Sequence, residues 1–392
     1  MGLWDWLTGR VTPDRFAAMM IDAMRQAGLA QPVEYVEDDF SLRVGKRRKI
    51  PLETAYEEYI EAPSSVRHHV VEHYAFGVFV RAQDLTPGSF KEAAPNLRPI
   101  VRGRMYPEYM RMQAEIDDDP WIDPPTRVIG EHFAEMLAYD MPERVLYLPS
   151  ARLEDWGESV ERAFEGTPGR IYVGAWDDGY GASRVTTPEM ILKLELSGRP
   201  VVALPNPETL IVAASEDDEA LLQMGRMISQ AESEAGFESG IVLTLDDERW
   251  RPFLPPEGGE AFELLYRQRV ASYWRDYDEQ KRLMDALNRK RGVDTEVAPF
   301  LAHHDRMTHE LNTMTIWLKN GDTLLPKSQI VSFATGDPKN PTMLGAARWD
   351  RVMAAASNLM EPTDHYPERW RVSGFPATEQ LDAMGLAAPP EG

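Results

Sequence analysis

The fold is decided by residues 199–236, which read R-P-V-V-A-L-P-N-P-E-T-L-I-V-A-A-S-E-D-D-E-A-L-L-Q-M-G-R-M-I-S-Q-A-E-S-E-A-G. Two apolar runs rich in β-branched residues, 201–204 and 210–214, are separated by the turn residues P-N-P at 205–207. Such runs flanking a short turn are typical of two strands joined as a hairpin. The sequence therefore predicts a β-hairpin over this first half of the stretch.

The second half of the stretch has the pattern of an amphipathic helix. Ser215 is a good N-cap, and the acids at 216–218 lie where the helix dipole favours negative charge. Gly236 is expected to end the helix. The apolar residues recur at spacings of three and four on one face: Leu221, Met224, Ile228 and Ala231. Because an apolar helix face must be covered, we expect this helix to pack on the hairpin, which makes the fold class α+β.

Composition limits the possible classes of protein. The chain has 392 residues, of which 43% are hydrophobic and 9% aromatic, enough apolar material for two or three folded domains. A net charge of -22 disfavours nucleic-acid binding, although an acidic protein that mimics nucleic acid and binds a basic partner remains an alternative. The chain has no cysteine, which excludes disulfides, thiolate metal sites and thiol nucleophiles.

Targeting signals are also missing from the sequence. No run approaches the roughly 20 apolar residues that a membrane helix needs. The start, M-G-L-W-D-W-L-T-G-R, has no basic region followed by a long apolar segment. We therefore expect a cytoplasmic protein without a membrane partner.

The domain organisation follows from breaks in the pattern, of which P-P-E-G-G at 255–259 is the clearest. Residues 1–85 are expected to form a helical N-terminal region with a short hairpin, and 86–256 an α+β central domain. A long helix is expected over 257–291. Residues 292–392 are expected to form a β-rich C-terminal domain with one helix.

The long helix carries an apolar seam. Its aromatic and aliphatic residues follow a 3.5-residue repeat that Gln280 interrupts: Tyr266, Val270, Tyr273, Tyr277, Met284 and Leu287. Such a seam needs a partner, which is either the chain's own core, a second helix or a second copy of the chain. Tyr266, Val270, Tyr273 and Tyr277 are therefore candidate binding residues for a protein partner or for self-association.

Beyond the long helix, the pattern is mostly that of strands. Two apolar runs, 314–318 and 323–325, flank Asn320-Gly321, a dipeptide typical of tight hairpin turns. Residues 330–333 have the composition of a third strand, and 349–360 have the spacing of an amphipathic helix.

The richest group of potential metal ligands lies between the long helix and these strands. His303, His304, His309 and Glu310 are close together in the sequence. They lack the H-E-x-x-H order of a zinc protease, in which two histidines one helical turn apart flank the acid. A metal-dependent hydrolase using these residues is thus an alternative function. Neither a dinucleotide-binding glycine pattern, nor a phosphate loop, nor a G-x-S-x-G elbow occurs, so no cofactor is predicted.

Four stretches, taken in order along the chain, resemble a known protein family. Residues 52–62 (L-E-T-A-Y-E-E-Y-I-E-A), 99–104 (P-I-V-R-G-R), 131–157 (E-H-F-A-E-M-L-A-Y-D-M-P-E-R-V-L-Y-L-P-S-A-R-L-E-D-W-G) and 201–212 (V-V-A-L-P-N-P-E-T-L-I-V) resemble the YtpQ-like family of uncharacterised bacterial proteins. The resemblance covers approximately residues 1–256. It implies a cytosolic bacterial protein of unknown biochemical role and carries over no catalytic residues.

The sequence contains more apolar helix and strand faces than groups of residues suited to catalysis or metal binding. The leading hypothesis is therefore a non-catalytic cytosolic protein that binds another macromolecule, through the long helix and the C-terminal β-rich domain.

Overall fold

The hairpin and helix of residues 199–236 are the centre of the fold in the computed structural model. Strands β10 (Pro200–Ala203) and β11 (Ile211–Ala214) pair antiparallel, and α8 (Asp218–Glu232) follows them. One face of α8 packs on the hairpin in a shared core that includes Val201, Ala203, Ile211, Leu221, Met224 and Ile228. The expectation of an α+β fold is confirmed.

The structure describes residues 11–26, 29, 32–45, 48–62, 67–71, 74–75, 96–119, 121, 123–141, 144–147, 164–167, 170–174, 176, 178–234, 236–304, 310–319, 321–337 and 340–386. By its internal contacts the chain divides into two compact units, Met1–Glu92 and Ala93–Gly392. The expected long helix and C-terminal β-rich part both lie within the second unit.

The cap of α8 differs from the expectation. The N-cap is Asp217, whose carboxylate accepts a hydrogen bond from the backbone N–H of Ala220 at 3.0 Å. Ser215 lies too early in the chain for this role, and its hydroxyl instead accepts a bond from the backbone N–H of Arg199 at 3.0 Å. The helix also ends before it reaches Gly236. A carboxylate accepts a bond from the first turn more strongly than a hydroxyl does, because it is charged.

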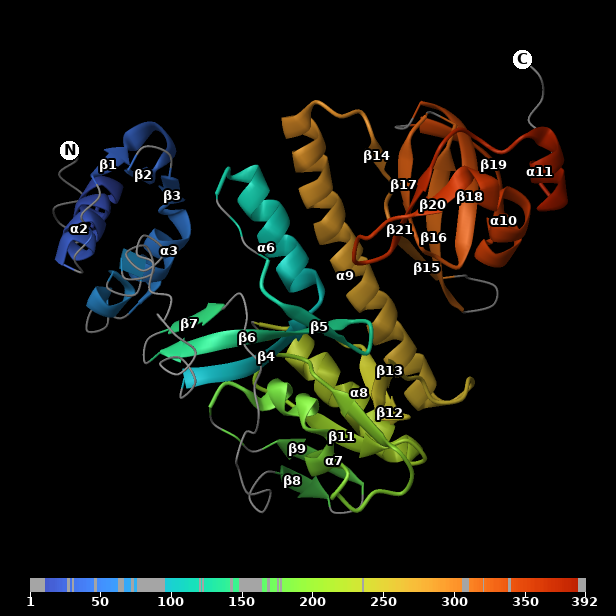
Figure 1. Ribbon diagram of the computed structural model, residues 1–392, viewed down its shortest axis with the longest axis horizontal. Coiled ribbons are helices and arrows are strands. Elements are labelled where there is room, and N and C mark those ends of the chain that lie inside the picture. The colour runs from blue at the N-terminus through green and yellow to red at the C-terminus, as the bar shows by residue number, and fades with distance from the viewer. Residues whose placement is uncertain are drawn as a thin grey trace. The chain divides into compact units, whose positions relative to one another are not determined.

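The first unit places helices beside a small antiparallel sheet of order β1-β2-β3 (Figure 1). Its core includes Phe16, Met20 and Met24 from α2 together with Leu42 from β2 and Leu52. The elements are α2 (Pro13–Gln26), β1 (Val33–Val36), η1 (Glu37–Asp39), β2 (Ser41–Val44), β3 (Arg48–Pro51) and α3 (Glu53–Glu61).

In the second unit, β10 and β11 lie in the middle of a six-stranded sheet of order β13-β12-β10-β11-β9-β8. Both faces of these two strands are buried, which explains their continuous apolar runs. The other strands are β8 (Phe164–Thr167), β9 (Ile171–Gly174), β12 (Val242–Asp246) and β13 (Arg249–Pro252). One face of the sheet packs on α8, and the other packs on residues of β4 (Leu97–Gly103), η4 (Gly181–Thr186) and α7 (Pro188–Ile191).

A second antiparallel sheet has the order β4-β6-β5, and β7 also pairs with β6. Its strands are β4 (Leu97–Gly103), β5 (Thr126–Ile129), β6 (Phe133–Met141) and β7 (Arg144–Tyr147). Helix α6 (Met105–Ile116) begins directly after β4. This connection brings the end of β4 close to the long helix, because α6 packs along that helix.

The long helix is α9 (Glu260–Arg291), 32 residues in length. It contacts α8 and α6 from the central part and β14 and β15 from the C-terminal part. Figure 1 shows α9 running from the six-stranded sheet to the C-terminal strands, so that both parts pack against this helix. Among the described residues, no helix has both the length and the apolar content needed to cross a bilayer.

Two four-stranded sheets form the C-terminal part, with the orders β14-β17-β21-β20 and β15-β16-β18-β19. Side chains from both sheets meet in one core around Trp317, which is 0% exposed. The strands are β14 (Glu296–Val297), β15 (Leu301–His304), β16 (Leu311–Leu318), β17 (Thr323–Pro326), β18 (Ile330–Asp337), β19 (Asn340–Arg348), β20 (Met360–Pro362) and β21 (Arg369–Val372). The helices are α10 (Trp349–Ala356), η5 (Ser357–Leu359) and α11 (Thr378–Ala383), and α11 was not expected from the sequence.

The hairpin expected around Asn320-Gly321 is wrong. β16 and β17 do flank this dipeptide, but β16 pairs with β15 and β18, whereas β17 pairs with β14 and β21. Consecutive strands therefore enter different sheets. The turn dipeptide indicates a reversal of the chain, and the buried faces of the two strands decide which neighbours they pair with.

The turn of the central hairpin packs tightly on η4, which gives a stability prediction. A Cβ atom added at Gly181 would lie 1.8 Å from the backbone oxygen of Glu208. Gly181→Ala must therefore displace the hairpin turn, and we expect it to lower the free energy of unfolding of the second unit by about 2–3 kcal/mol. Urea denaturation measures this loss. The control is Gly259→Ala, where a Cβ meets no atom within 4 Å and the cost should stay below about 1 kcal/mol. Equal losses in the two variants would contradict this packing.

Candidate functional site on the inner face of the long helix

Polar side chains from distant parts of the second unit meet on the inner face of α9. They come from the end of β4, the turn before β6, the loop before β12, α9 itself and the loop before β21. We call this group the α9 polar cluster, and it consists of Arg102, Arg104, His132, Glu238, Tyr273, Asp276 and Tyr366. Convergence of titratable groups from separate segments is the usual mark of a functional site or of a specific structural junction.

A chain of hydrogen bonds runs through the centre of the cluster. The hydroxyl of Tyr273 lies 3.2 Å from Nε2 of His132, and Nδ1 of His132 lies 3.2 Å from the hydroxyl of Tyr366. The hydroxyl of Tyr366 donates to Oδ2 of Asp276, also at 3.2 Å. His132 and Tyr366 are only 4% and 5% exposed. The imidazole is thus held on both ring nitrogens by the chain's own side chains.

Burial controls the charge of this chain. Desolvation lowers the pKa of His132 to about 3, helped by the positive charges of Arg269 and Arg104. Desolvation raises the pKa of Asp276 to about 7 against the opposing effect of Tyr366. His132 is therefore neutral at physiological pH, and the carboxyl group of Asp276 changes its charge near neutrality.

Glu238 forms the second carboxyl group of the cluster. Oε2 of Glu238 accepts a hydrogen bond from the backbone N–H of Gly103 at 2.7 Å, and Oε1 lies 3.4 Å from Nε of Arg102. Desolvation nevertheless raises the pKa of Glu238 to about 7, because it outweighs these favourable contacts. Glu238 also raises the pKa of Asp276 by charge repulsion.

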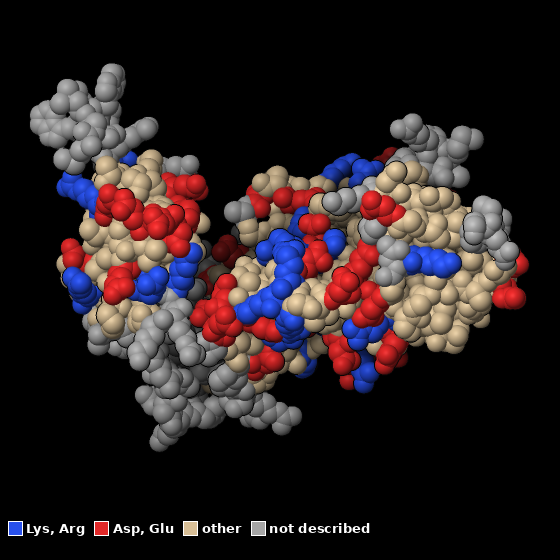
Figure 2. Space-filling view, turned by 90° about the horizontal axis from the view of Figure 1, so that it is seen from above, with Lys and Arg blue, Asp and Glu red and all other residues tan. Residues whose placement is uncertain are grey.

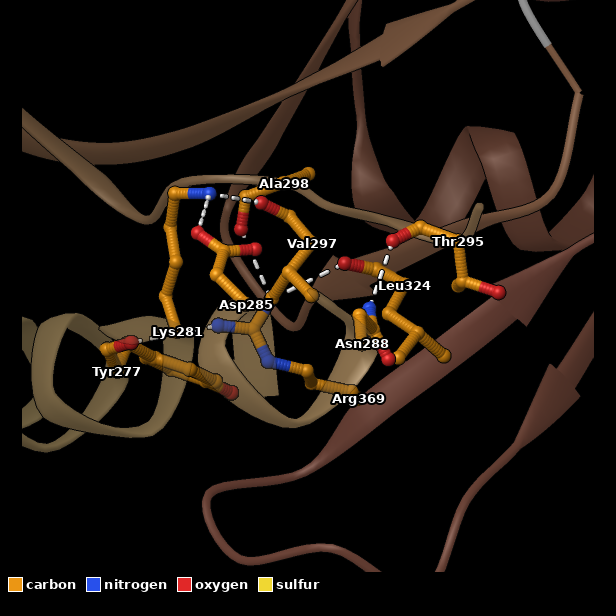
Figure 3. Close-up of polar contacts among 9 residues, drawn as sticks. All are labelled: Tyr277, Lys281, Asp285, Asn288, Thr295, Val297, Ala298, Leu324 and Arg369. Carbon is orange, nitrogen blue, oxygen red and sulfur yellow. Dashed lines mark hydrogen bonds and ion pairs between the residues drawn. The ribbon is translucent and has the colours of Figure 1, made fainter. Parts of the chain in front are cut away.

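A second polar junction lies farther along α9, around Arg369 of β21 (Figure 3). Arg369 is 0% exposed. Its guanidinium donates to main-chain oxygens of Ala298, Leu324 and Tyr277 at 2.8, 3.0 and 3.3 Å, and to the side-chain oxygen of Gln280. Burial lowers the pKa of Arg369 to about 10, so it stays charged at neutral pH. The planar fork of Arg suits this set of acceptors because its N–H groups point in several fixed directions.

Four consecutive residues, 366–369, bond to α9, and we call them the docking segment. Tyr366 bonds to Asp276, as described above. The backbone oxygen of Pro367 accepts from Nε2 of Gln280 at 2.9 Å, and that of Glu368 accepts from the hydroxyl of Tyr277 at 2.7 Å. Arg369 completes the series. The docking segment therefore fixes the C-terminal sheets to residues 276–280 of α9, slightly more than one helical turn.

Polar contacts continue toward the C-terminal end of the helix. Lys281 Nζ lies 2.8 Å from Oδ2 of Asp285 and donates to the backbone oxygen of Val297 at 2.7 Å. Nδ2 of Asn288 donates to the backbone oxygen of Thr295 at 2.8 Å. Figure 3 shows these side chains pointing from α9 toward the strand-bearing part of the chain. The helix and the C-terminal sheets thus meet through hydrogen bonds as well as apolar contacts.

The apolar seam of α9 packs for the most part against the chain's own residues, which is one of the three partners expected for it. Val270 and Tyr277 are 3% and 2% exposed. Tyr273 bonds to His132, and Tyr266 is partly buried. Of the alternatives for covering the seam, the chain's own core is the one found. Tyr266 and Tyr273 keep part of their surface exposed, and binding of a partner by the four residues stays a prediction.

The histidine cluster proposed for metal binding lies partly outside the described residues. His303 is exposed on β15, and Glu310 is exposed just before β16. His304 belongs to β15, but its side chain and the whole of His309 fall outside the described residues. In the described part of the chain, no group of three His, Asp or Glu side chains is placed to hold a metal ion. Metal binding by the four residues stays a prediction.

The α9 polar cluster has the ingredients of acid–base chemistry, since two of its carboxyl groups titrate near neutrality. Its hydrogen-bonding groups, however, face one another. Both ring nitrogens of His132 and the hydroxyl of Tyr366 are engaged within the cluster. This arrangement is typical of a junction that holds segments together.

Comparisons with protein-family models, with curated proteins and with solved structures find no match. The resemblance to the YtpQ-like family therefore stays an expectation, and the function is inferred from the residues themselves.

Sequence reasoning missed His132, Glu238, Asp276, Tyr366 and Arg369. One signal was present in α9, where Asp276 precedes Tyr277 and both Tyr273 and Gln280 lie within one turn of it. A carboxylate beside an apolar seam indicates a buried polar partner. The partners themselves had no local signal, because His132 and Tyr366 are 234 positions apart.

Replacement of the buried guanidinium gives one prediction. Arg369→Met keeps much of the side-chain volume but leaves the three main-chain oxygens and Gln280 without their donor. Because each buried unsatisfied group costs about 1–3 kcal/mol, we expect a loss of about 3–5 kcal/mol in the free energy of unfolding, measured by urea denaturation. Arg371→Met is the control, since Arg371 lies on the same strand with a side chain 51% exposed. A loss there of more than about 1 kcal/mol would count against burial as the cause.

The raised pKa of Glu238 gives a second prediction. A carboxyl whose pKa is higher in the folded state stabilises the fold fully below its unfolded pKa, and this contribution disappears as pH rises through the folded pKa. The stability of the wild type relative to Glu238→Gln should therefore fall between pH 4.5 and about 7, by about 1–3 kcal/mol. Denaturation of both proteins at pH 5, 6 and 8 checks this. A constant difference across this range would show that Glu238 has an ordinary pKa.

Proposed function

We propose that the protein is a non-catalytic binding protein of the cytoplasm that docks another macromolecule on the outward face of α9. The inner face of this helix packs for the most part on the protein's own core, whereas the opposite side is open to solvent. Its exposed residues recur at helical spacing and form what we call the outer stripe: Glu263, Arg267, Trp274, Asp278 and Arg282.

Trp274 is the observation that carries this proposal. It is 48% exposed, although tryptophan is a large and mostly apolar side chain. Single exposed apolar residues are common on monomers, so its location matters more than its exposure. Trp274 lies near the middle of the helix that organises the second unit, with charged residues of both signs around it. An aromatic anchor with a charged rim is the arrangement found at the energetic centres of protein interfaces.

The inner face of α9 supports the non-catalytic part of the proposal. In the α9 polar cluster, the two tyrosines, His132 and Asp276 are hydrogen-bonded to one another, and His132 and Tyr366 are almost fully buried. Glu238 accepts a bond from the backbone N–H of Gly103. Catalysis requires such groups within hydrogen-bonding reach of a substrate. The cluster is better suited to holding the C-terminal sheets in place behind the outer stripe.

The two alternative functions stay open as predictions. A metal-dependent hydrolase would use His303, His304, His309 and Glu310, and elemental analysis of the purified protein tests it directly. An acidic mimic would use the net charge of -22. On the face drawn in Figure 2, basic side chains are interleaved with the acidic ones, which is unlike the continuous negative surface of nucleic acid.

Site-specific photo-cross-linking tests the docking surface. With a photo-reactive phenylalanine analogue in place of Trp274, we expect a discrete cross-linked adduct in cells, because a partner covers this position. Mass spectrometry of the adduct distinguishes a different protein from a second copy of the chain. Addition of Trp274→Ala protein without the analogue should compete less well for the partner than the wild type, by roughly tenfold or more for an energetic centre.

The matched control places the same analogue at Met343 on β19, which is 50% exposed and thus equally open to chance encounters. Adducts of the same mass and yield at both positions would indicate nonspecific capture. Absence of an adduct at position 274 would exclude the outer stripe as the docking surface.

A further inference from the structure

The hydrogen-bond chain of the α9 polar cluster has a direction that depends on one proton. In the structure, Tyr366 donates to Asp276, so its oxygen can only accept toward His132. Nδ1 of His132 then carries the ring proton, and Nε2 accepts from the hydroxyl of Tyr273. Every bond in this direction fits a neutral imidazole and an ionised Asp276.

Protonation of Asp276 permits the opposite direction. A protonated carboxyl can donate its proton to a nearby acceptor, and the hydroxyl oxygen of Tyr366 lies 3.2 Å from Oδ2 of Asp276. Tyr366 then donates to Nδ1 of His132, and the ring proton moves to Nε2, which donates to Tyr273. Proton number balances, because the chain gains one proton at Asp276 and the imidazole changes only its tautomer.

We propose that this chain is a proton-responsive latch, in which uptake of a proton by Asp276 switches the tautomer of His132 and tightens the hold of the docking segment on α9. Two features of the geometry support it. All three donor–acceptor distances are 3.2 Å, which is long for bonds to a ring nitrogen and longer than usual for the hydroxyl–carboxylate bond, so that reversal breaks no strong bond. The chain also passes through Tyr366, the first residue of the docking segment, before it reaches Asp276.

The surroundings explain why the protonated form holds better. An ionised Asp276 faces Glu238 across the cluster, and this repulsion adds to the cost of burying its charge, whereas Arg275 beside it on α9 partly offsets that cost. Other charged or titratable groups face the chain from each neighbouring element: Arg102 and Arg104 from β4 and its following turn, Glu131 from the turn before β6, Arg269 from α9, and Glu368 from the docking segment. With the carboxyl protonated, the repulsion and the desolvation cost both disappear.

Nitrogen NMR of the histidine ring tests the tautomer switch, with the full-length protein labelled at its histidines. As the pH falls from 9 to 5, we expect the signal typical of a protonated ring nitrogen to move from Nδ1 to Nε2 of His132. The midpoint should lie near the pKa of Asp276, about 7. Asp276→Asn should abolish the exchange, and Glu260→Gln, an exposed change in the first turn of the same helix, should leave it intact. Tyr366→Phe keeps the ring but cuts the chain, so His132 should no longer respond. An unchanged tautomer in the wild type, or a switch that survives Asp276→Asn, overturns the proposal.

Hydrogen exchange of residues 363–369 tests the latch itself. If opening exposes Asp276, the opening equilibrium should rise about tenfold for each pH unit between pH 5 and pH 7 and then level off, after correction for intrinsic exchange rates. Asp276→Asn should remove most of this dependence. Glu238→Gln should keep it, which separates the two carboxyl groups. Equal pH dependence in the wild type and in Asp276→Asn would show that Asp276 does not control the docking segment.

Discussion

The second unit depends on a short stretch of chain that is bonded to one helix residue by residue. Tyr366, Pro367, Glu368 and Arg369 each make a hydrogen bond to α9, and the last of them is a guanidinium without solvent exposure. A buried cation is costly unless its N–H groups find acceptors in fixed positions. Main-chain oxygens before β15, on β17 and on α9 supply those positions. The constraint is mutual, because moving any one of these elements leaves the cation unsatisfied.

This constraint explains why the long helix belongs to both halves of the second unit. Apolar packing alone would let the C-terminal sheets slide or rotate on α9, since dispersion contacts have little directional preference. Two polar residues on the inner face, Asp276 and Gln280, remove that freedom because both bond to the docking segment. A buried polar residue in an otherwise apolar seam fixes register at some cost in stability, as it does in coiled coils. Gln280, which interrupts the repeat in the sequence, has this role.

The sequence predicted the elements whose signals are local. The hairpin and helix of residues 199–236 and the long helix after 259 depend on periodicity and turn residues that lie close together in the chain. Prediction from the sequence failed for the pairing of strands, which depends on residues far apart in the chain. The Asn320-Gly321 dipeptide predicts a hairpin, yet β17 pairs with β14 and β21 and not with β16. The α9 polar cluster could not be predicted from the sequence for the same reason. Its members come from separate elements, and each resembles an ordinary surface residue in its own segment.

The two faces of α9 are coupled by its geometry. Trp274 of the outer stripe and Asp276 of the inner cluster lie on the same turn of a rigid helix. A partner that binds the outer stripe more tightly in one state of the docking segment must, by linkage, shift the proton affinity of Asp276 by the same free energy. A partner with equal affinity for both states would shift nothing. Binding on the outside and proton uptake on the inside are therefore coupled when the partner has a different affinity for the two states of the docking segment, and the sign of the effect reports which state the partner prefers.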